Sequence, residues 1–276
     1  MDQVIVISGL AQGMGLEVAK LVAAGGGTVA GFDVDREGLQ SLDQELGARG
    51  CRRFLLPLDI RDRAGILSFR DNVLDRFGRV DTVLSNVGIG FFGPFEEVDL
   101  EEALRCLEIN VIGAAALFQA FLPSMRSRGR GKLIAMSSLV GQIPFPFESV
   151  YSASKFALEG LVLSLRYEVQ PFGIQVALVE PAQVSTNFAQ KIHRLPPEGS
   201  PYRERVRRFI ERDRELIRNA PDPRKAARRI VALIESERMK THNQVDPMST
   251  FFLFFNRILP EAVRDRILLH HMRIRV

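Results

Sequence analysis

The chain contains little cysteine and histidine and no tryptophan. Its 276 residues include 2 cysteines and 4 histidines. The two cysteines, Cys51 and Cys106, are too few for a disulfide framework or a cysteine-based zinc site, and the histidines do not follow the spacing of a metal-binding motif. We therefore expect no bound metal and a reducing, cytoplasmic environment.

Long hydrophobic runs and linkers are scarce as well. The longest uncharged stretch, from Ile109 to Met125, is shorter than a membrane span and predicts a buried helix. The first residues carry no basic cluster, so we expect no signal peptide. No segment rich in proline, serine or glycine interrupts the middle, and 46% hydrophobic and 25% charged residues are ordinary for a globular protein. We expect one domain over residues 1–276.

Short apolar runs alternate with longer amphipathic segments, which is typical of parallel strands joined by crossover helices. Strands are predicted near residues 3–8, 28–33, 53–57, 81–85, 131–137, 174–180 and 242–246. Helices are predicted near residues 14–24, 36–47, 62–77, 98–127, 150–170 and 223–238. The pattern indicates an α/β fold of the Rossmann type, a doubly wound parallel sheet of about seven strands with helices on both faces. Its ligand site should lie at the carboxyl ends of the strands.

Positive charge is concentrated at the C-terminal end of the chain. Residues 1–200 carry 19 Lys and Arg against 23 Asp and Glu, whereas residues 201–276 carry 18 against 10. The arginine-rich run 203–214 mixes both signs, which is typical of a solvent-exposed helix. Because its basic residues are not interleaved with stacking aromatics, we expect no nucleic-acid partner.

Three glycines, Gly9, Gly13 and Gly15, follow the first predicted strand where a helix begins. Glycine there allows a tight turn and a close approach of the backbone to a pyrophosphate, although tight packing of strand against helix would also favour it. The second predicted strand ends in Asp33, 18 residues beyond Gly15. A carboxylate there accepts from a ribose 2′-hydroxyl and repels a 2′-phosphate, so NAD is favoured over NADP, with Arg36 softening that repulsion.

Tyr151 and Lys155 are four residues apart in a predicted helix and therefore share one of its faces. A cation beside a phenol lowers the pKa of tyrosine and makes it a better acid and base near neutral pH. Ser138, 13 residues before Tyr151 at a strand end, brings a hydroxyl to the same substrate oxygen. Each feature alone is common, but together, behind a glycine-rich turn, they indicate a catalytic site.

With these residues the chain resembles the short-chain dehydrogenase/reductase family over nearly all of residues 3–246, in its compact single-domain subgroup. The family's TGxxxGxG motif corresponds to residues 8–15, its NNAG motif to residues 85–88, and its PGxxxT motif to residues 181–186. The YxxxK motif corresponds to Tyr151 and Lys155. Four conservative departures from these motifs are Ser8, Ser85, Val87 and Ala182.

The resemblance implies a role for each matching residue. Tyr151 would exchange a proton with the substrate oxygen, Ser138 would orient that oxygen, and Lys155 would hold the nicotinamide ribose and lower the pKa of Tyr151. Asn110 would hold a water that relays protons to solvent. The residues implied to bind the cofactor are Ser8, Gly9, Gln12, Gly13, Met14, Gly15, Asp33, Asp59, Ile60, Asn86, Gly88, Tyr151, Lys155, Pro181, Val184 and Thr186.

Phenylalanines gather around the expected substrate site, where apolar walls suit a lipophilic compound. They are Phe91, Phe92, Phe95, Phe145, Phe147 and Phe188, and packing into the core is the alternative for several of them. The segment after Thr186 resembles the lid of steroid- and retinol-dehydrogenase-like members, so we expect a lid over about 187–220. An apolar and basic extension over about 248–276 would cover the substrate mouth, contact a second subunit or dock on an anionic membrane surface.

We therefore expect an oxidoreductase that transfers a hydride between NAD and a lipophilic secondary or primary alcohol, or the matching ketone, of steroid, retinoid or aryl-alcohol type. A carbonyl reductase that uses NADPH is the second interpretation. A non-catalytic relative that senses the cofactor or acts as a scaffold is the third, and the presence of Asn110, Ser138, Tyr151 and Lys155 argues against it. The resemblance also implies a homodimer or homotetramer formed through the two long helices.

Overall fold

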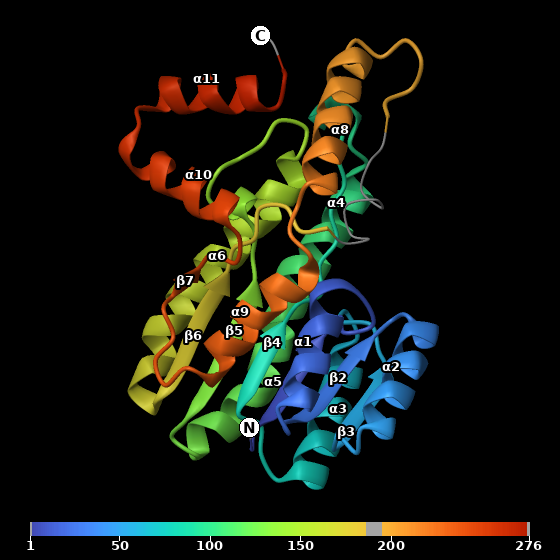
Figure 1. Ribbon diagram of the computed structural model, residues 1–276, viewed down its shortest axis with the longest axis vertical. Helices are drawn as coiled ribbons and strands as arrows, with labels where there is room; N and C mark the ends of the chain where they lie inside the picture. The colour runs from blue at the N-terminus through green and yellow to red at the C-terminus, as the bar shows by residue number, and fades with distance from the viewer. Residues whose placement is uncertain (1, 186–194, 275–276) are drawn as a thin grey trace.

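The computed structural model describes residues 2–185 and 195–274, and within them seven parallel strands form one sheet (Figure 1). The strand order is β3-β2-β1-β4-β5-β6-β7. The strands are β1 (Val4–Ser8), β2 (Thr28–Asp33), β3 (Arg53–Pro57), β4 (Thr82–Ser85), β5 (Gly131–Met136), β6 (Ile174–Val179) and β7 (His242–Asn243). The predicted doubly wound parallel sheet is thereby confirmed. Strand β7 is shorter than the predicted 242–246 because the chain turns at Asp246, which caps the next helix.

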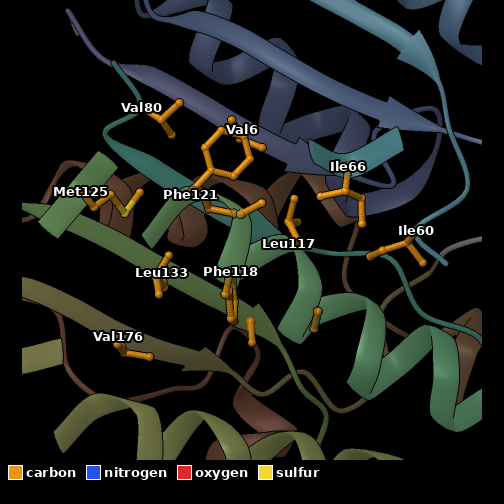
Figure 2. Packing of buried hydrophobic residues seen from close by; sticks show 14 of the residues in the cluster. Val6, Ile60, Ile66, Val80, Leu117, Phe118, Phe121, Met125, Leu133 and Val176 are labelled. Carbon is orange, nitrogen blue, oxygen red and sulfur yellow. The ribbon is translucent and has the colours of Figure 1, made fainter. Parts of the chain in front are cut away.

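Helices cover both faces of the sheet because successive strand residues point to opposite sides. Val4 and Val6 of β1 point toward α3 (Arg63–Phe77), α5 (Ala114–Ser127) and α6 (Ser149–Val169). Ile5 and Ile7 point toward α1 (Gly13–Ala24), α2 (Arg36–Ala48) and α9 (Pro223–Glu235). Figure 2 shows the first of these two cores, in which Phe118 and Phe121 of α5 pack with Leu133 of β5.

Helix α4 (Leu100–Leu107) continues into α5 through a π-helical turn, Glu108–Gly113, where one regular helix over 98–127 was predicted. Asn110 lies in this turn, and its side chain binds the backbone of Ile89. Its Oδ1 accepts from Ile89 N and its Nδ2 donates to Ile89 O, both at 2.8 Å. Such turns inside helices are frequent at functional sites. The segment Leu100–Ser127 is long and apolar enough to cross a membrane by length and composition, but 50% of its most apolar window is buried in the fold.

Three helices from the C-terminal third lie over the carboxyl ends of the strands (Figure 1). They are α8 (Arg203–Arg218), α10 (Pro247–Ile258) and α11 (Glu261–His271). With short 3-10 turns at Phe95–Glu97 and Leu139–Gly141, they enclose a third apolar cluster, separate from the two cores of the sheet. A further 3-10 turn, Gln170–Phe172, follows α6. The expected lid and C-terminal extension are described except for residues 186–194 and 275–276.

Candidate active site

The glycine-rich turn after β1 forms one end of a cavity of about 530 Å³. Gly9 and Gly13 have φ angles of +72° and +60°, which favour glycine. A Cβ at Gly15 would lie 2.2 Å from the Gly9 carbonyl oxygen, so only glycine allows the helix to start this close to the turn. Asn86, just after β4, stabilises the turn because its Nδ2 donates to Gly9 O at 2.7 Å. Ser8 completes the support by accepting from Asn86 N at 3.1 Å.

Two observations show that this end of the cavity fits a dinucleotide. The N-cap of α1, Gln12, makes no side-chain hydrogen bond to the helix, so the first N–H groups remain available to an anion. Asp33 lines the cavity, where its Oδ2 accepts from Ala11 N at 3.0 Å and its Oδ1 accepts from Asp35 N at 3.1 Å. A pyrophosphate would meet the helix, and a ribose would meet Asp33.

Of the other residues implied to bind the cofactor, some line the cavity and others do not. Those that line the cavity with Gly9, Gln12 and Gly13 are Met14, Asn86, Gly88, Pro181 and Val184. Asp59 and Ile60 are not brought to it: Asp59 pairs with Arg61 at 2.6 Å, and Ile60 is buried in the core against Gly113. Thr186 lies outside the described residues. For Asp59, Ile60 and Thr186 cofactor binding stays a prediction.

The structure brings Ser138, Tyr151 and Lys155 together in the middle of the cavity. The Tyr151 hydroxyl is hydrogen-bonded to the Ser138 side chain, and Lys155 Nζ lies 5.7 Å from the centre of the Tyr151 ring. Lys155 Nζ also donates to Met136 O at the end of β5, at 2.8 Å. Two elements therefore fix the three groups: the end of β5 carries Ser138, and one face of α6 carries Tyr151 and Lys155.

Asn110 lies behind this group and is not among the described residues that line the cavity. Its Nδ2 donates to Ser154 Oγ on α6 at 2.9 Å, which ties the π-helical turn to the helix that carries Tyr151. A Cβ at Gly88 would be 3.4 Å from Asn110 Oδ1 and 3.5 Å from Lys155 Nζ. Gly88 therefore lies between the amide and the ammonium and keeps the space between them free of a side chain.

Burial has the largest effect on the pKa values of Tyr151 and Lys155. Desolvation, and then the charge of Glu148, raise the pKa of Tyr151, while its hydrogen bond with Ser138 lowers it. Desolvation lowers the pKa of Lys155 to about 8. The expectation that the pKa of Tyr151 is depressed is wrong for the protein as described, because the cost of burying a phenolate outweighs the favourable contacts.

The far end of the cavity has apolar walls, and only some of the expected phenylalanines form them. Phe91, Phe92 and Phe145 line the cavity. Phe147 instead packs its ring against Phe209 of α8, with centroids 5.7 Å apart. Phe95 is 67% exposed, because it starts a surface 3-10 turn. Phe188 lies outside the described residues.

Sequence reasoning missed several residues that line this far end. Met248 and Phe252 of α10 and His271 of α11 line it, so the C-terminal helices cover this end of the cavity. Two acids, Glu148 and Asp213, also line it, with exposures of 6% and 4%. Glu148 is three residues before Tyr151, a position that a search for titratable neighbours would have found. Asp213 lies in an arginine-rich helix and gives no such signal.

A second buried polar cluster lies on the other side of Lys155. It contains Glu159, Glu180 and His242, whose ligand-type atoms all lie within 4.8 Å of one another. His242 Nδ1 is 2.6 Å from Glu180 Oε1, and Gln244 Nε2 donates to Glu180 Oε2 at 2.6 Å. Desolvation, with Glu180 adding to it, raises the pKa of Glu159 to about 8. Sequence spacing could not reveal this grouping, because its members come from α6, the end of β6 and β7.

The model of the short chain dehydrogenase family matches residues 3–195. The chain therefore belongs to the short-chain dehydrogenase family. Human 17-beta-hydroxysteroid dehydrogenase type 1 is 41% identical over 143 residues, which are 52% of this chain and 43% of that protein. Mouse dehydrogenase/reductase SDR family member 7B is 32% identical over 205 residues, 73% of this chain and 63% of that protein. The chain thus spans less than two thirds of the length of these two relatives.

One relative and two solved structures match over most of both chains. The 3-ketodihydrosphingosine reductase of Bacteroides thetaiotaomicron is 29% identical over 248 residues, 89% of this chain and 88% of that protein. A short-chain dehydrogenase from Streptomyces avermitilis superposes with a TM-score of 0.83 at 33% identity, over 96% of this chain and 94% of that one. An alcohol dehydrogenase from Thermococcus sibiricus, complexed with 5-hydroxy-NADP, has a TM-score of 0.74 at 25% identity, over 88% of this chain and 96% of that one.

Proposed function

We propose that the protein is an NAD-dependent oxidoreductase that interconverts a lipophilic alcohol and the matching ketone or aldehyde. The observation that carries this proposal is the hydrogen-bonded pair of Ser138 and Tyr151, with Lys155 one helical turn along, between a dinucleotide-like cradle and an apolar chamber. A bound nicotinamide would supply or accept the hydride. The chain itself would hold the substrate oxygen and move the proton.

Tyr151 exchanges that proton with the substrate oxygen, and Ser138 orients the oxygen by a hydrogen bond. The raised pKa of Tyr151 keeps the phenol protonated near neutral pH, which is the form that donates to a carbonyl oxygen. Lys155, with a pKa of about 8, can take up or release a proton in the same range. Because Gly88 leaves the space beside Lys155 and Asn110 free of a side chain, a water there would carry the proton onward.

Asp33 supports NAD rather than NADP. Its carboxylate is fixed by two backbone N–H groups at the cavity wall, where a 2′-phosphate would place a second negative charge beside it. Arg36, the first residue of α2, is exposed and three residues away, so we keep the NADPH-dependent carbonyl reductase as the second candidate. A known relative of the fold is complexed with an NADP derivative.

The chamber beyond Tyr151 supports a lipophilic substrate. Its walls include Leu139, Val140, Phe145, Ile217 and Phe252, none of which offers a hydrogen bond from its side chain. Two relatives are named for a steroid and for ketodihydrosphingosine, both lipophilic compounds. A steroid, retinoid or aryl-alcohol type of substrate fits these walls.

Assembly and location are part of the same proposal. Leu100, Leu104 and Phe156 expose 72%, 52% and 44% of their surface on α4 and α6, which supports a homodimer or homotetramer through these helices. Phe251 and Phe254 of α10 are 55% and 59% exposed and support peripheral contact with a membrane. The free cysteines, Cys51 and Cys106, support a reducing, cytoplasmic setting.

A cofactor titration followed by a substrate screen tests this function. NADH should bind at least tenfold more tightly than NADPH, and Asp33→Asn should narrow that ratio because the negative charge at the ribose is lost. Steroid, retinoid and aryl alcohols are then offered with the preferred oxidised cofactor. Tighter binding of NADPH would favour the reductase, and binding without turnover of any alcohol or ketone would favour the non-catalytic relative.

A further inference from the structure

One short loop of the cavity wall, residues 181–184, connects the neighbourhood of Ser138 to the helices that cover the chamber. All four of its residues line the cavity. The loop follows β6, and Pro181 O accepts from Leu139 N at 2.8 Å and from Ser138 Oγ at 3.4 Å. A cofactor that extends from the glycine-rich turn to Tyr151 would therefore lie against residues 181–184.

Asp246 joins this loop to α10. Its Oδ2 accepts from Ala182 N at 2.8 Å, and its Oδ1 accepts from Ser249 N at 2.7 Å in the first turn of the helix. Asp246 is 1% exposed, so its carboxylate depends on these protein donors rather than on water. Met248 and Phe252 of the same helix line the far end of the cavity. One buried carboxylate thus connects the loop to a wall of the substrate chamber.

The helix alone does not require an aspartate at position 246. Asparagine and serine are about as good as aspartate at a helix N-cap, because the cap hydrogen bond needs a single acceptor oxygen. Here two backbone N–H groups, from Ala182 and Ser249, meet the same side chain and need two acceptors. A carboxylate supplies both, whereas asparagine has one acceptor oxygen and an NH₂ group that only donates. Asp246 is therefore suited to a bridge between loop and helix.

A second hydrogen bond runs from the same loop to the other covering helix. Gln183 Nε2 donates to Asp213 Oδ1 on α8 at 3.2 Å, and Asp213 also lines the cavity. This contact joins two side chains, which can rotate without moving the backbone. The contact through Asp246 joins two backbone N–H groups, so a displacement of the loop backbone acts on the start of α10 through a single side chain.

We propose that Asp246 is a positioning residue that transmits cofactor binding at residues 181–184 to α10 and so sets the wall of the substrate chamber. This rests on the proposed function and adds a coupling between its two binding sites. A cofactor that fixes the loop holds Ala182 N in place, and the carboxylate then holds the first turn of α10. Met248 and Phe252 are thereby fixed against the chamber.

Hydrogen–deuterium exchange of the full chain, with and without NADH, tests this coupling without a substrate. In the wild-type protein NADH should slow amide exchange by about threefold or more both in residues 8–15, the glycine-rich turn, and in α10. Asp246→Asn and Asp246→Ser both keep a helix cap. In these variants NADH should still slow exchange in the turn but no longer in α10. A purely structural role would change the exchange of α10 equally with and without NADH, which would leave the effect of NADH intact.

The matched control is Asp62→Asn, because Asp62 is an exposed cap of α3 that accepts from Gly65 N at 2.9 Å. This variant should respond to NADH as the wild-type protein does. The proposal is overturned if NADH slows exchange in the turn but not in α10 of the wild-type protein. It is also overturned if the effect on α10 persists in both Asp246 variants, since the cofactor would then act on the helix directly. An absence of any effect of NADH on residues 8–15 would refute the proposed function, and this inference with it.

Discussion

Replacing Gly15 with alanine tests whether the glycine-rich turn is built as a cofactor cradle. The new Cβ would lie 2.2 Å from Gly9 O and 2.6 Å from Asn86 Nδ2, both far inside van der Waals contact. The turn must therefore open, and the hydrogen bond from Asn86 to Gly9 O must lengthen. Gly160→Ala is the matched control, because it also lies in a helix and a Cβ there has nothing within 4 Å.

The magnitude follows from two opposing effects. Alanine in place of a helical glycine stabilises by about 0.5–1 kcal/mol, and this gain applies to both positions. Overpacking costs about 1–3 kcal/mol and applies to Gly15 alone. The two variants should therefore differ in free energy of unfolding by about 1–3 kcal/mol, with Gly160→Ala the more stable. Displacement of the turn should weaken NADH binding at least tenfold in Gly15→Ala.

Urea unfolding followed by circular dichroism measures the stability difference, and the fluorescence of NADH itself reports binding, since the chain has no tryptophan to serve as a donor. Gly160→Ala should bind NADH as the wild-type protein does. If Gly15→Ala is as stable as Gly160→Ala and binds NADH equally well, the close approach of α1 to the turn is not what shapes the site.

Two further substitutions address the polar groups around the site. Because the pKa of Glu159 is raised from 4.5 to about 8, its stabilising contribution is complete below pH 4.5, declines as pH rises and is gone above about pH 8. The free energy of unfolding of Glu159→Gln should lack this decline, which reaches at most about 1.4 kcal/mol per pH unit. Urea unfolding measures this free energy for both proteins from pH 5 to 8. The same pH dependence in both would contradict the burial of an ionisable Glu159. Asp246 accepts from Ser249 N at 2.7 Å and from Ala182 N at 2.8 Å, so Asp246→Ala should destabilise by about 2 kcal/mol through loss of the α10 cap and a buried hydrogen bond. A change below about 0.5 kcal/mol in urea unfolding would show that the cap is not needed.

The sheet and its helices could be predicted because their signals are local. Apolar runs such as residues 3–8 must be strands buried on both faces, and the amphipathic segments between them leave little choice but crossover helices. The glycine-rich turn, Tyr151 and Lys155 each lie within one short stretch of chain. Their spacing alone places them at strand ends and on one helix face.

What could not be predicted depends on contacts between distant segments. The π-helical turn at Asn110 exists because its side chain binds Ile89, and no periodicity reports such a contact. The upward shift of the Tyr151 pKa comes first from burial, which the sequence does not reveal, and then from Glu148, three residues earlier in the chain. The place of Phe252 and His271 in the cavity wall depends on how α10 and α11 pack against the rest of the fold, which the apolar pattern of residues 248–276 does not specify.

The most direct test of the central claim compares Tyr151→Phe with the wild-type protein in both cofactor binding and turnover. Tyr167→Phe is the control, because Tyr167 lies on the same helix and is 68% exposed. Tyr151→Phe should bind NADH within a few-fold of wild type and lose turnover of its best alcohol or ketone by about 10²–10⁴-fold, while Tyr167→Phe keeps both. Turnover near the wild-type rate in Tyr151→Phe would contradict the role of Tyr151 as the acid and base of this site.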